Sequence, residues 1–453
     1  MRFLFAIICM AAVPILTFPS AYAQVAGKND GLGDLAALFD AQPKMDAHAP
    51  ALTLDEAERI ALERNPEIAA VARKVATSQA HVATTGKLDD PMAMYRGWGV
   101  PLNQPGNFNA AQNMFSISQS LPGAGKRPLQ TSIARSDVEI AKSQLDQARL
   151  AVRVRVRKAF NDLLLTQEEM RIHDEHVDLA RQAIEAARIK YAVGKVSQQD
   201  ILKAQVTLTA LAEHMIRFDQ DADLARARLN TLLCRDPDTP IRALGKYRDP
   251  KPLPDLLTLK QLALNKRPDL QGAGKIVERS RKEEALTRKT MVPDFTVSAG
   301  YMLMPPSADM RNSYMLEGQM SLPWLNRGKH NAEIAEATAK VYEQSANLDA
   351  LRNSAFGEIQ EALVEARAAQ RLSALYQDHL RPQAEATLQS SVIAYENDKT
   401  DFLNLLDSQM VVINIDLAWL QASADFETRL ADLEMATGTV INATGSSTPE
   451  VKP

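Results

Sequence analysis

Two histidines, His173 and His176, are the first side chains in this sequence whose spacing could support metal chemistry. Residues three apart lie on one face of a helix, and imidazole nitrogens are common zinc ligands. A zinc site takes at least three protein ligands, however, and no third ligand stands close to this pair in the sequence. We therefore expect two surface histidines here, and the sequence predicts no metal site.

Other motifs that could carry catalysis are incomplete. The segment Gly123-Ala124-Gly125-Lys126 lacks the GxxxxGK[ST] spacing of a phosphate-binding loop. No Ser/His/Asp, Cys/His or paired-acid arrangement stands out, so the sequence predicts neither an enzyme nor a bound cofactor. A run of basic residues is typical of a solvated or interhelical helix face, and it comprises Arg153, Arg155, Arg157 and Lys158.

Methionine gives the one indication of a cargo. Thioethers are soft ligands that suit Cu(I), but methionine is also a flexible apolar filler. Both interpretations stay open on the sequence alone. Eight of the sixteen methionines fall in or beside the strands predicted below, namely Met92, Met94, Met114, Met302, Met304, Met310, Met315 and Met320.

The N-terminus indicates secretion. Arg2 precedes an apolar run from Phe3 to Leu16, and Ala21-Tyr22-Ala23 offers a cleavage site before Gln24. Residues 1–23 therefore have the pattern of a secretory signal peptide.

Cysteine and charge restrict the class of protein further. Cys9 lies inside the apolar run, which does not suit a lipoprotein, and the mature chain keeps Cys234 without a partner for an intrachain disulfide. The formal net charge is −4, and loss of Arg2 makes it one unit more negative. A mildly acidic chain is a poor nucleic-acid binder. No mature segment approaches 18 uninterrupted apolar residues, so we expect no transmembrane helix.

The elements that position these side chains occur twice. Four segments recur at offsets of 201 to 204 positions: Arg64-Asn65-Pro66 as Lys266-Arg267-Pro268, Pro91 as Pro293, Ser120-Leu121-Pro122 as Ser321-Leu322-Pro323, and Tyr191 with Lys195 as Tyr395 with Lys399. The unit is far longer than a solenoid repeat, so we predict a duplicated and fused domain. The predicted ranges are an N-terminal segment 24–50, a first repeat 51–240 (hairpin 92–121, tip 191–200), a second repeat 241–437 (hairpin 294–322, tip 395–404) and a tail 438–453.

Each repeat contains very long helices. Between Pro128 and Pro237 there is no further proline and the only glycine is Gly194, which predicts two helices that meet near Gly194. The ranges are about 128–191 and 199–234, with 329–396 and 402–436 as their counterparts. The first helix would be ~95 Å long, so these helices must pack side by side. Pro382 should kink or loosen its helix.

The segments between prolines alternate in polarity, which predicts strands. Residues 295–301 and 314–322 alternate clearly, 115–118 begin the same way, and 92–100 are less regular because they include Arg96. Two hairpins give four strands per chain. Open strand edges are not tolerated in lipid, so several chains would have to pool their strands. Trp98 and Trp324 could then anchor the membrane interfaces, or they could be ordinary packing residues.

Together these features resemble the TolC-type outer-membrane efflux factors over about residues 50 to 440. The resemblance is carried by the duplication, one strand hairpin per half, the Leu-Pro…Gly-Lys strand-to-helix junctions and the Tyr…Gly-Lys…Asp-Ile-Leu helix tip. It implies a mixed α/β membrane protein made mainly of long α-helices. Three chains would form an α-helical periplasmic tunnel and share one transmembrane β-barrel, and residues 24–50, 236–262 and the C-terminus would belt the tunnel.

The resemblance also implies a function. The chain would be the outer-membrane export duct of a tripartite efflux system in a Gram-negative bacterium, with a periplasmic adaptor, an inner-membrane pump of the RND type and outer-membrane lipid as its partners. The chain resembles the heavy-metal cation branch more than the drug branch, so heavy-metal cations are the expected cargo. A duct for drugs, small molecules or type I secretion is the alternative.

The helix tips are the control point that the resemblance implies. The acidic ring positions of the family fall at Asn404 and Asp407, so one ring, at Asp407, is expected. Asp200 matches the tip acid of the first repeat, and the alternative is that it caps a helix. Its usual basic partner falls at Thr400, which leaves Lys195, Lys399 or Tyr395 as substitutes. The remaining tip residues are Tyr191 for the gate and Val193, Gly194, Asn397 and Asp398 for adaptor contact.

Two other classes of protein share some of these features. A periplasmic coiled-coil adaptor or scaffold would also be secreted and helical, but it would carry a single helical hairpin. A secreted enzyme would need the catalytic arrangement that the sequence lacks. Two helical hairpins and two strand pairs favour the duct.

Overall fold

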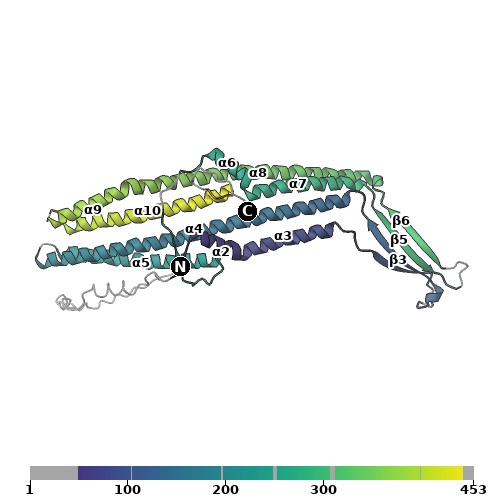
Figure 1. Ribbon diagram of the computed structural model, residues 1–453, viewed down its shortest axis with the longest axis horizontal. Helices are drawn as coiled ribbons and strands as arrows, with labels where there is room; N and C mark the ends of the chain where they lie inside the picture. Colours follow the sequence, from purple (N-terminus) through teal and green to yellow (C-terminus); the bar gives the residue numbers. More distant parts are fainter. Residues whose placement is uncertain are drawn as a thin grey trace, which may run out of the picture.

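The computed structural model describes residues 49–441 apart from 101, 104, 195–196, 248–251, 307–311 and 398. The predicted signal peptide, Lys195 and Asp398 lie outside the described residues. The chain is elongated, with helices running along most of its length, strands at one end and helical turns at the other (Figure 1). No helix within the described ranges is long and apolar enough to cross a membrane.

The first repeat begins with two helices that meet at Asn65 and Pro66. Asn65 ends the first of them, and its side-chain oxygen accepts a hydrogen bond of 2.9 Å from the Glu67 amide at the start of the second. Pro66 occupies the first helical position, where its missing N–H costs nothing. The elements are α2 (Leu54–Arg64), α3 (Pro66–Thr85), β2 (Met92–Trp98), β3 (Gln112–Leu121), α4 (Lys126–Ala192) and α5 (Gln198–Leu232).

The second repeat follows the same order. Arg267-Pro268 divides its two short helices as Asn65-Pro66 does in the first repeat. The elements are α6 (Leu256–Lys266), α7 (Pro268–Arg288), β5 (Phe295–Leu303), β6 (Ser313–Met320), α8 (Arg327–Leu375), the π-helix η4 (Tyr376–Leu380), α9 (Arg381–Glu396) and α10 (Phe402–Thr437).

The later long helix is interrupted at Pro382, as predicted. Five residues of π-helix, Tyr376–Leu380, separate α8 from α9, and Pro382 stands in the first turn of α9. Proline has no N–H to donate and its ring crowds the preceding turn, so a wider turn relieves that contact. The first repeat has no such proline, and α4 runs unbroken for 67 residues.

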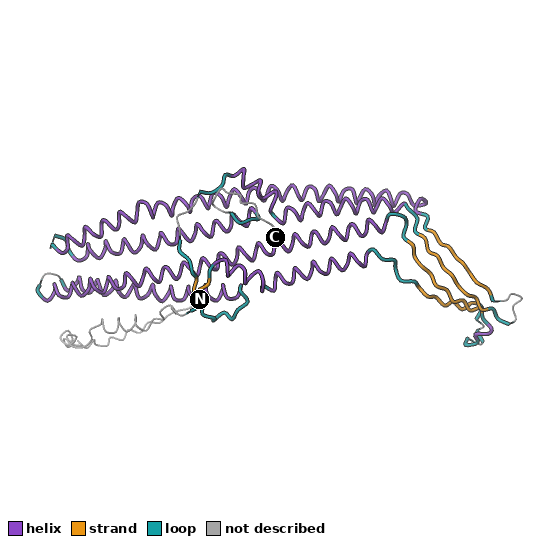
Figure 2. The backbone as a smooth tube through the Cα atoms, in the orientation of Figure 1, coloured by secondary structure: helices purple, strands orange, loops and turns teal. Residues whose placement is uncertain are grey.

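The two strand hairpins join into one antiparallel sheet in the order β2-β3-β5-β6. The central pair, β3 with β5, links the two repeats and sets Phe115 opposite Tyr301. The sheet projects beyond the helices at one end of the chain (Figure 2). A second, two-stranded sheet of β1 (Ala51–Leu52) and β4 (Arg242–Ala243) lies near the middle of the chain.

The glycine-rich segment at 123–126 is a junction between the repeats. The Asp294 carboxylate accepts hydrogen bonds from the Gly123 amide at 2.6 Å and from Lys126 Nζ at 2.7 Å. A Cβ atom at Gly123 would lie 2.6 Å from the Pro293 carbonyl oxygen, so a larger residue would not fit there. This contact holds the start of α4 against the start of β5.

Small side chains allow the long helices to pack closely. Ala57, Ala61, Val152 and Val156 are buried together near the middle of the chain, with Leu229 of α5 against them. Val152 and Val156 of α4 therefore face the neighbouring helices. Close packing of this kind is what an elongated bundle needs, because it has no single globular core.

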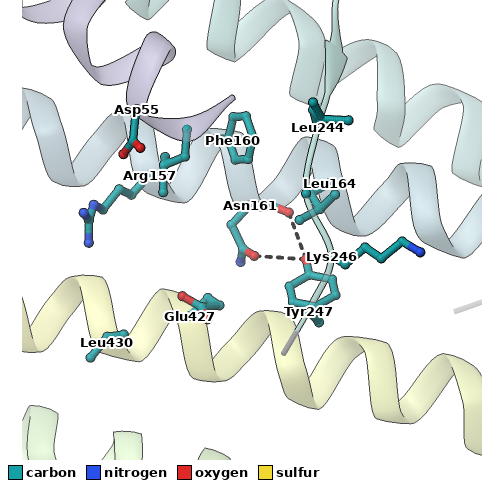
Figure 3. A pocket seen from close by; sticks show the side chains of 12 residues that line it. Asp55, Arg157, Phe160, Asn161, Leu164, Leu244, Lys246, Tyr247, Glu427 and Leu430 are labelled. Atoms are coloured by element: carbon teal, nitrogen blue, oxygen red, sulfur yellow. Dashed lines mark hydrogen bonds between the residues drawn. The ribbon is translucent and has the colours of Figure 1, made fainter. Parts of the chain in front are cut away.

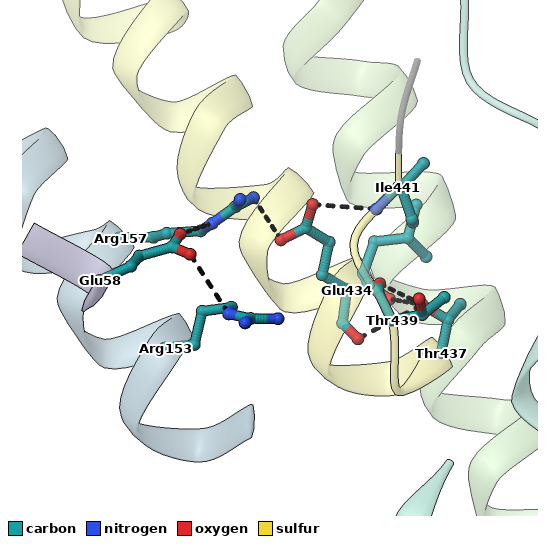
Figure 4. A network of polar contacts seen from close by, with 8 residues as sticks. Glu58, Arg153, Arg157, Glu434, Thr437, Thr439 and Ile441 are labelled. Atoms are coloured by element: carbon teal, nitrogen blue, oxygen red, sulfur yellow. Dashed lines mark hydrogen bonds and ion pairs between the residues drawn. The ribbon is translucent and has the colours of Figure 1, made fainter. Parts of the chain in front are cut away.

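The basic run on α4 forms an interhelical face. Arg157 pairs with Glu58 of α2 and with Glu434 of α10, each at 2.5 Å, and Arg153 reaches Glu58 at 3.2 Å (Figure 4). Burial raises the pKa of Glu434 even though Arg157 favours its charged form. Glu434 also accepts a hydrogen bond of 3.0 Å from the Ile441 amide. This network fastens three helices and the C-terminal segment at one level.

Candidate functional site

The candidate site is the pair of helical turns at the end remote from the strands. One turn joins α4 to α5 and the other joins α9 to α10, and both lie at the same end of the molecule (Figure 1). Apolar residues from all four helices form one core beneath the turns: Val177, Ala180, Ile184, Ala187, Ala204, Leu208, Leu211, Tyr395, Phe402, Leu405, Leu406 and Ile413. The two tips of one chain are therefore packed against each other.

A lysine that sequence reasoning missed connects the two turns. Lys190 Nζ donates a hydrogen bond of 2.9 Å to the Tyr395 carbonyl oxygen and lies 3.7 Å from the centre of the Tyr395 ring. The Tyr395 ring is buried and lies 5.9 Å from the ring of Phe402. Tyr191, its counterpart in the first repeat, is exposed instead.

The first turn presents its backbone at the surface. Gly194 has φ of +73°, a conformation that suits glycine, and its amide donates to the Tyr191 carbonyl oxygen at 2.9 Å. Val193 is exposed beside it. These two residues are available to a partner, and adaptor contact stays a prediction.

Asp200 caps the first turn's outgoing helix. Its carboxylate accepts hydrogen bonds of 2.9 Å from the amide and from the hydroxyl of Ser197, and the Asp200 amide donates to Ser197 Oγ at 3.3 Å. This reciprocal arrangement is a capping box. The capping alternative therefore describes Asp200 in this chain, and its role in a gate stays a prediction.

The second turn is capped differently. Asp401, which sequence reasoning missed, accepts a hydrogen bond of 2.9 Å from the Asn404 amide. Asn404 in turn donates from Nδ2 to Thr400 Oγ1 at 3.2 Å. An acidic residue just before an apolar run is a helix-start signal that could have identified Asp401. Asn397 and Lys399 are exposed in the same turn.

Asp407 lies on an exposed stripe of α10. Asn404, Asp407, Val411 and Asn414 are all exposed and follow the helical spacing of three and four residues. The stripe faces away from the core that the four helices share. An Asp407 carboxylate in this position is free to face a duct or a neighbouring copy, and its ring role stays a prediction.

The prediction that His173 and His176 are surface histidines is wrong. His173 is 1% exposed and His176 is 7% exposed, because α4 packs there against α5 and α10. The His173 ring meets Phe218 edge-on at 5.6 Å. Burial, with His214 and His176 nearby, lowers the pKa of His173 to about 4, so His173 is neutral at physiological pH.

His176 belongs to a polar contact near the π-helix. Its Nε2 lies 3.7 Å from Asp416 Oδ2, and Asp416 accepts a hydrogen bond of 2.7 Å from Arg381 Nε. Although burial opposes it, hydrogen bonding to His176 and Arg381 lowers the pKa of Asp416. The guanidinium of Arg381 also lies 4.6 Å from the Trp419 ring. These contacts tie α4, α9 and α10 together where the long helix is interrupted.

A cavity of about 420 Å³ lies near the middle of the chain (Figure 3). Two of its polar side chains are hydrogen-bonded: Tyr247 Oη donates to Asn161 Oδ1 at 2.9 Å, and Asn161 Nδ2 donates to the Ala424 carbonyl oxygen at 2.8 Å. Burial, with nearby carboxylates, raises the pKa of Tyr247. The arrangement holds the segment after β4 on α4 and α10, and we assign it a structural role.

Comparison with known proteins identifies relatives of this chain. The chain is similar to the cobalt-zinc-cadmium resistance protein CzcC of Cupriavidus metallidurans, at 23% identity over 82% of this chain and 86% of CzcC. It is also similar to the outer membrane protein TolC of Escherichia coli, at 28% identity over 33% of this chain and 29% of TolC.

Solved structures share the fold. The structure of CusC matches with a TM-score of 0.70 at 16% identity, over 85% of this chain and 92% of CusC. The outer-membrane channel OprN matches with a TM-score of 0.69 at 18% identity, over 85% of this chain and 89% of OprN.

The sequence profile of the outer membrane efflux proteins matches this chain twice, over residues 59–235 and 259–439. The first range falls within the predicted first repeat, and the second covers most of the predicted second repeat. Members of this family are channels of the outer membrane that extend into the periplasm, rather than enzymes. The matched ranges take in the long helices, both strand hairpins and both helix tips. The chain therefore belongs to the outer membrane efflux protein family.

Proposed function

We propose that three copies of this chain form a passive export duct for heavy-metal cations, fed by an inner-membrane pump of the RND type through a periplasmic adaptor. The observation that carries the proposal is the division of the chain into two ends. A two-faced strand sheet occupies one end, and long helical hairpins with exposed turns occupy the other. A duct needs a membrane end and a docking end, and under this proposal the sheet is the membrane end and the turns are the docking end.

The sheet supports an assembly of several copies. Its edge strands within the described chain are β2 and β6, and each edge would expose backbone groups to hydrocarbon unless another copy paired with it. The longest strand, β3, has ten residues, or about 33 Å, which matches the hydrocarbon thickness. Trp98 and Trp324 are exposed at opposite ends of the sheet, where two membrane interfaces would lie.

The exposed stripe of α10 supports the gate. Three copies of Asp407 at a narrow mouth would concentrate negative potential and favour cations. Val193, Gly194 and Asn397 would contact the adaptor, together with Asp398. Lys190 would hold the two tips of each chain together while the duct is closed. The chain itself would perform no catalysis.

The similarity to CzcC supports the cargo, because that protein is named for resistance to cobalt, zinc and cadmium. The alternative cargo is a drug, small molecule or secreted protein, which the wider family fold would also accommodate. A deletion strain of the native bacterium separates these possibilities. We expect it to accumulate Zn(II), Cd(II) or Co(II) and to regain tolerance when the chain is restored. Unchanged metal content with greater drug sensitivity would contradict the metal assignment.

A further inference from the structure

The two faces of the strand sheet differ in chemistry. One face carries Tyr95, Phe115, Tyr301, Tyr314 and Leu316, all of them exposed. The residues that alternate with these along each strand lie on the opposite face of the sheet. Ser116, Ser298 and Glu317 share that face with most of the strand methionines. We call this second face the methionine face. It has the polar character of a pore lining, and the first face has the apolar character of a lipid contact.

Four methionines on this face, one from each strand, lie in two neighbouring rows. A row here is the set of residues that are directly opposite one another across the four strands. Met114 of β3 is directly opposite Met302 of β5 on one side and Arg96 of β2 on the other, and the Arg96 guanidinium turns toward Met94. Met315 of β6 is opposite Gly300, two residues before Met302, and Met94 of β2 is opposite Ser116, two residues after Met114. Directly opposite residues have Cβ atoms about 5 Å apart, and diagonal neighbours are about 7 Å apart. Long thioether side chains at these spacings can converge.

Small residues lie between the thioethers of one row. Ser116 and Gly300 occupy the two central positions of the row that ends in Met94 and Met315. Ser116 is 5% exposed, and its buried hydroxyl oxygen has no hydrogen-bond partner within the described structure. A buried hydroxyl without a partner is available to a water or an ion.

On the central strand β3 the methionine face is the more enclosed one. Met114 is 6% exposed, whereas Phe115 and Ile117 on the apolar face of the same strand are 50% and 61% exposed. The sheet projects beyond the helices (Figure 2), so this difference indicates that the sheet curls toward the methionine face. A curled sheet brings the side chains of its inner face closer together.

We infer that Met114, Met302 and Met315 form a thioether site for a soft monovalent cation, Cu(I) or Ag(I), on the inner face of the sheet. Thioether sulfur prefers such cations to harder ones, and a neutral ligand set needs no nearby carboxylate. Met94 is a weaker candidate because its sulfur already accepts a contact of 3.8 Å from Arg96 Nη2. This site deepens the proposed function and rests on it, since cargo reaches the site only if the methionine face lines the duct.

The test is Cu(I) binding by the full mature chain, extracted from outer membranes in detergent. Both the parent and the variants carry Cys234→Ser, because the exposed thiol of Cys234 would itself bind Cu(I). Cu(I) is kept reduced with ascorbate and partitioned against a coloured chelator, bathocuproine disulfonate. The variant is Met114→Leu, Met302→Leu and Met315→Leu combined, which removes the sulfur and nearly keeps the volume.

Two matched controls carry the same substitution elsewhere in the sheet. Met320→Leu alters the apolar face of β6. Met92→Leu alters the methionine face two register positions from Met94 and four from the pair that contains Met114. We expect the triple variant to bind Cu(I) at least tenfold more weakly than the parent and both controls to bind like the parent. Equal binding by the triple variant, or no binding by the parent, would overturn the site.

X-ray absorption on the Cys234→Ser parent keeps the test decisive if the triple variant does not fold. We expect a first shell of sulfur around bound Cu(I), and a shell of nitrogen or oxygen alone would overturn the site. Export of Zn(II) and Cd(II) distinguishes the two proposals. If export persists without Cu(I) binding, the thioether site alone is wrong, and if export of every metal fails, the duct proposal is wrong.

Discussion

The ammonium group of Lys190 lies 3.7 Å from the centre of the Tyr395 ring and donates a hydrogen bond of 2.9 Å to the carbonyl oxygen of the same residue. This contact joins the tip of the first repeat to the tip of the second. A cation over an aromatic face contributes roughly 0.5–2 kcal/mol. Under the proposed function, a contact of this strength holds the two tips together in the closed duct and breaks when the duct opens.

Lys190→Met should loosen the tips. The substitution removes the charge and the donor and keeps an apolar side chain, so a loss of about 1.4 kcal/mol would raise the open fraction about tenfold. Planar-bilayer recording should show a higher baseline conductance. Lys203→Met, at an exposed lysine of α5, is the matched control and should leave the conductance unchanged. Equal baselines in all three proteins would exclude Lys190 from closure.

Asp407→Asn should lower the cation selectivity of the duct and relieve its block by divalent cations. Three carboxylates at one level would attract cations, and the attraction would weaken as salt is added. Reversal potentials and Mg²⁺ block in planar bilayers measure both effects. Glu396→Gln removes an exposed carboxylate on the other side of the turn and should have a smaller effect. If Asp407→Asn conducts like the parent, the ring lies elsewhere.

Arg157→Met should strongly destabilise the middle of the bundle. It would leave Glu434, whose side chain is 2% exposed, as an unpaired buried charge, and breaking such a pair costs about 3–5 kcal/mol. Arg155→Met is a close control, because Arg155 pairs with Glu67 and both side chains are about half exposed. The loss of stability in Arg155→Met should be below about 1 kcal/mol. Thermal unfolding of the detergent-solubilised proteins measures both losses. We expect Arg157→Met to unfold at a lower temperature than Arg155→Met, and equal unfolding temperatures would contradict the prediction.

His173 should make the fold sensitive to mild acid. Its pKa is about 4 in the folded chain and 6.5 as a free side chain, so between these values the unfolded state binds more protons. The contribution of neutral His173 to the free energy of unfolding is fully present above pH 6.5. As the pH falls toward 4, the free energy of unfolding decreases by up to about 3 kcal/mol. His173→Leu should flatten the thermal stability over this window. His81→Leu, at an exposed histidine, should keep the slope of the parent.

The long elements could be predicted because their boundaries are local. Helix breakers are absent between Pro128 and Gly194, and the predicted helix 128–191 compares with α4 at Lys126–Ala192. The alternation of residues 295–301 likewise corresponds to β5 at Phe295–Leu303. Both signals are local, because propensity and periodicity act within one element.

The contacts between helices could not be predicted in the same way. Lys190 has no counterpart in the second repeat, where the equivalent position is Ala394, so the duplication did not point to it. His173 stands in a polar stretch of α4, and only the packing of α5 brings Phe218 over it. Burial of this kind depends on which helices become neighbours, which a single sequence does not specify.

The most direct test of the duct is the location and mass of the native assembly. Membranes of the native bacterium are fractionated, and the chain is extracted in mild detergent and analysed by native mass spectrometry. We predict a trimer in the outer-membrane fraction, because the β2 and β6 edges need partners from other copies. A monomer in the soluble periplasmic fraction would contradict the export duct.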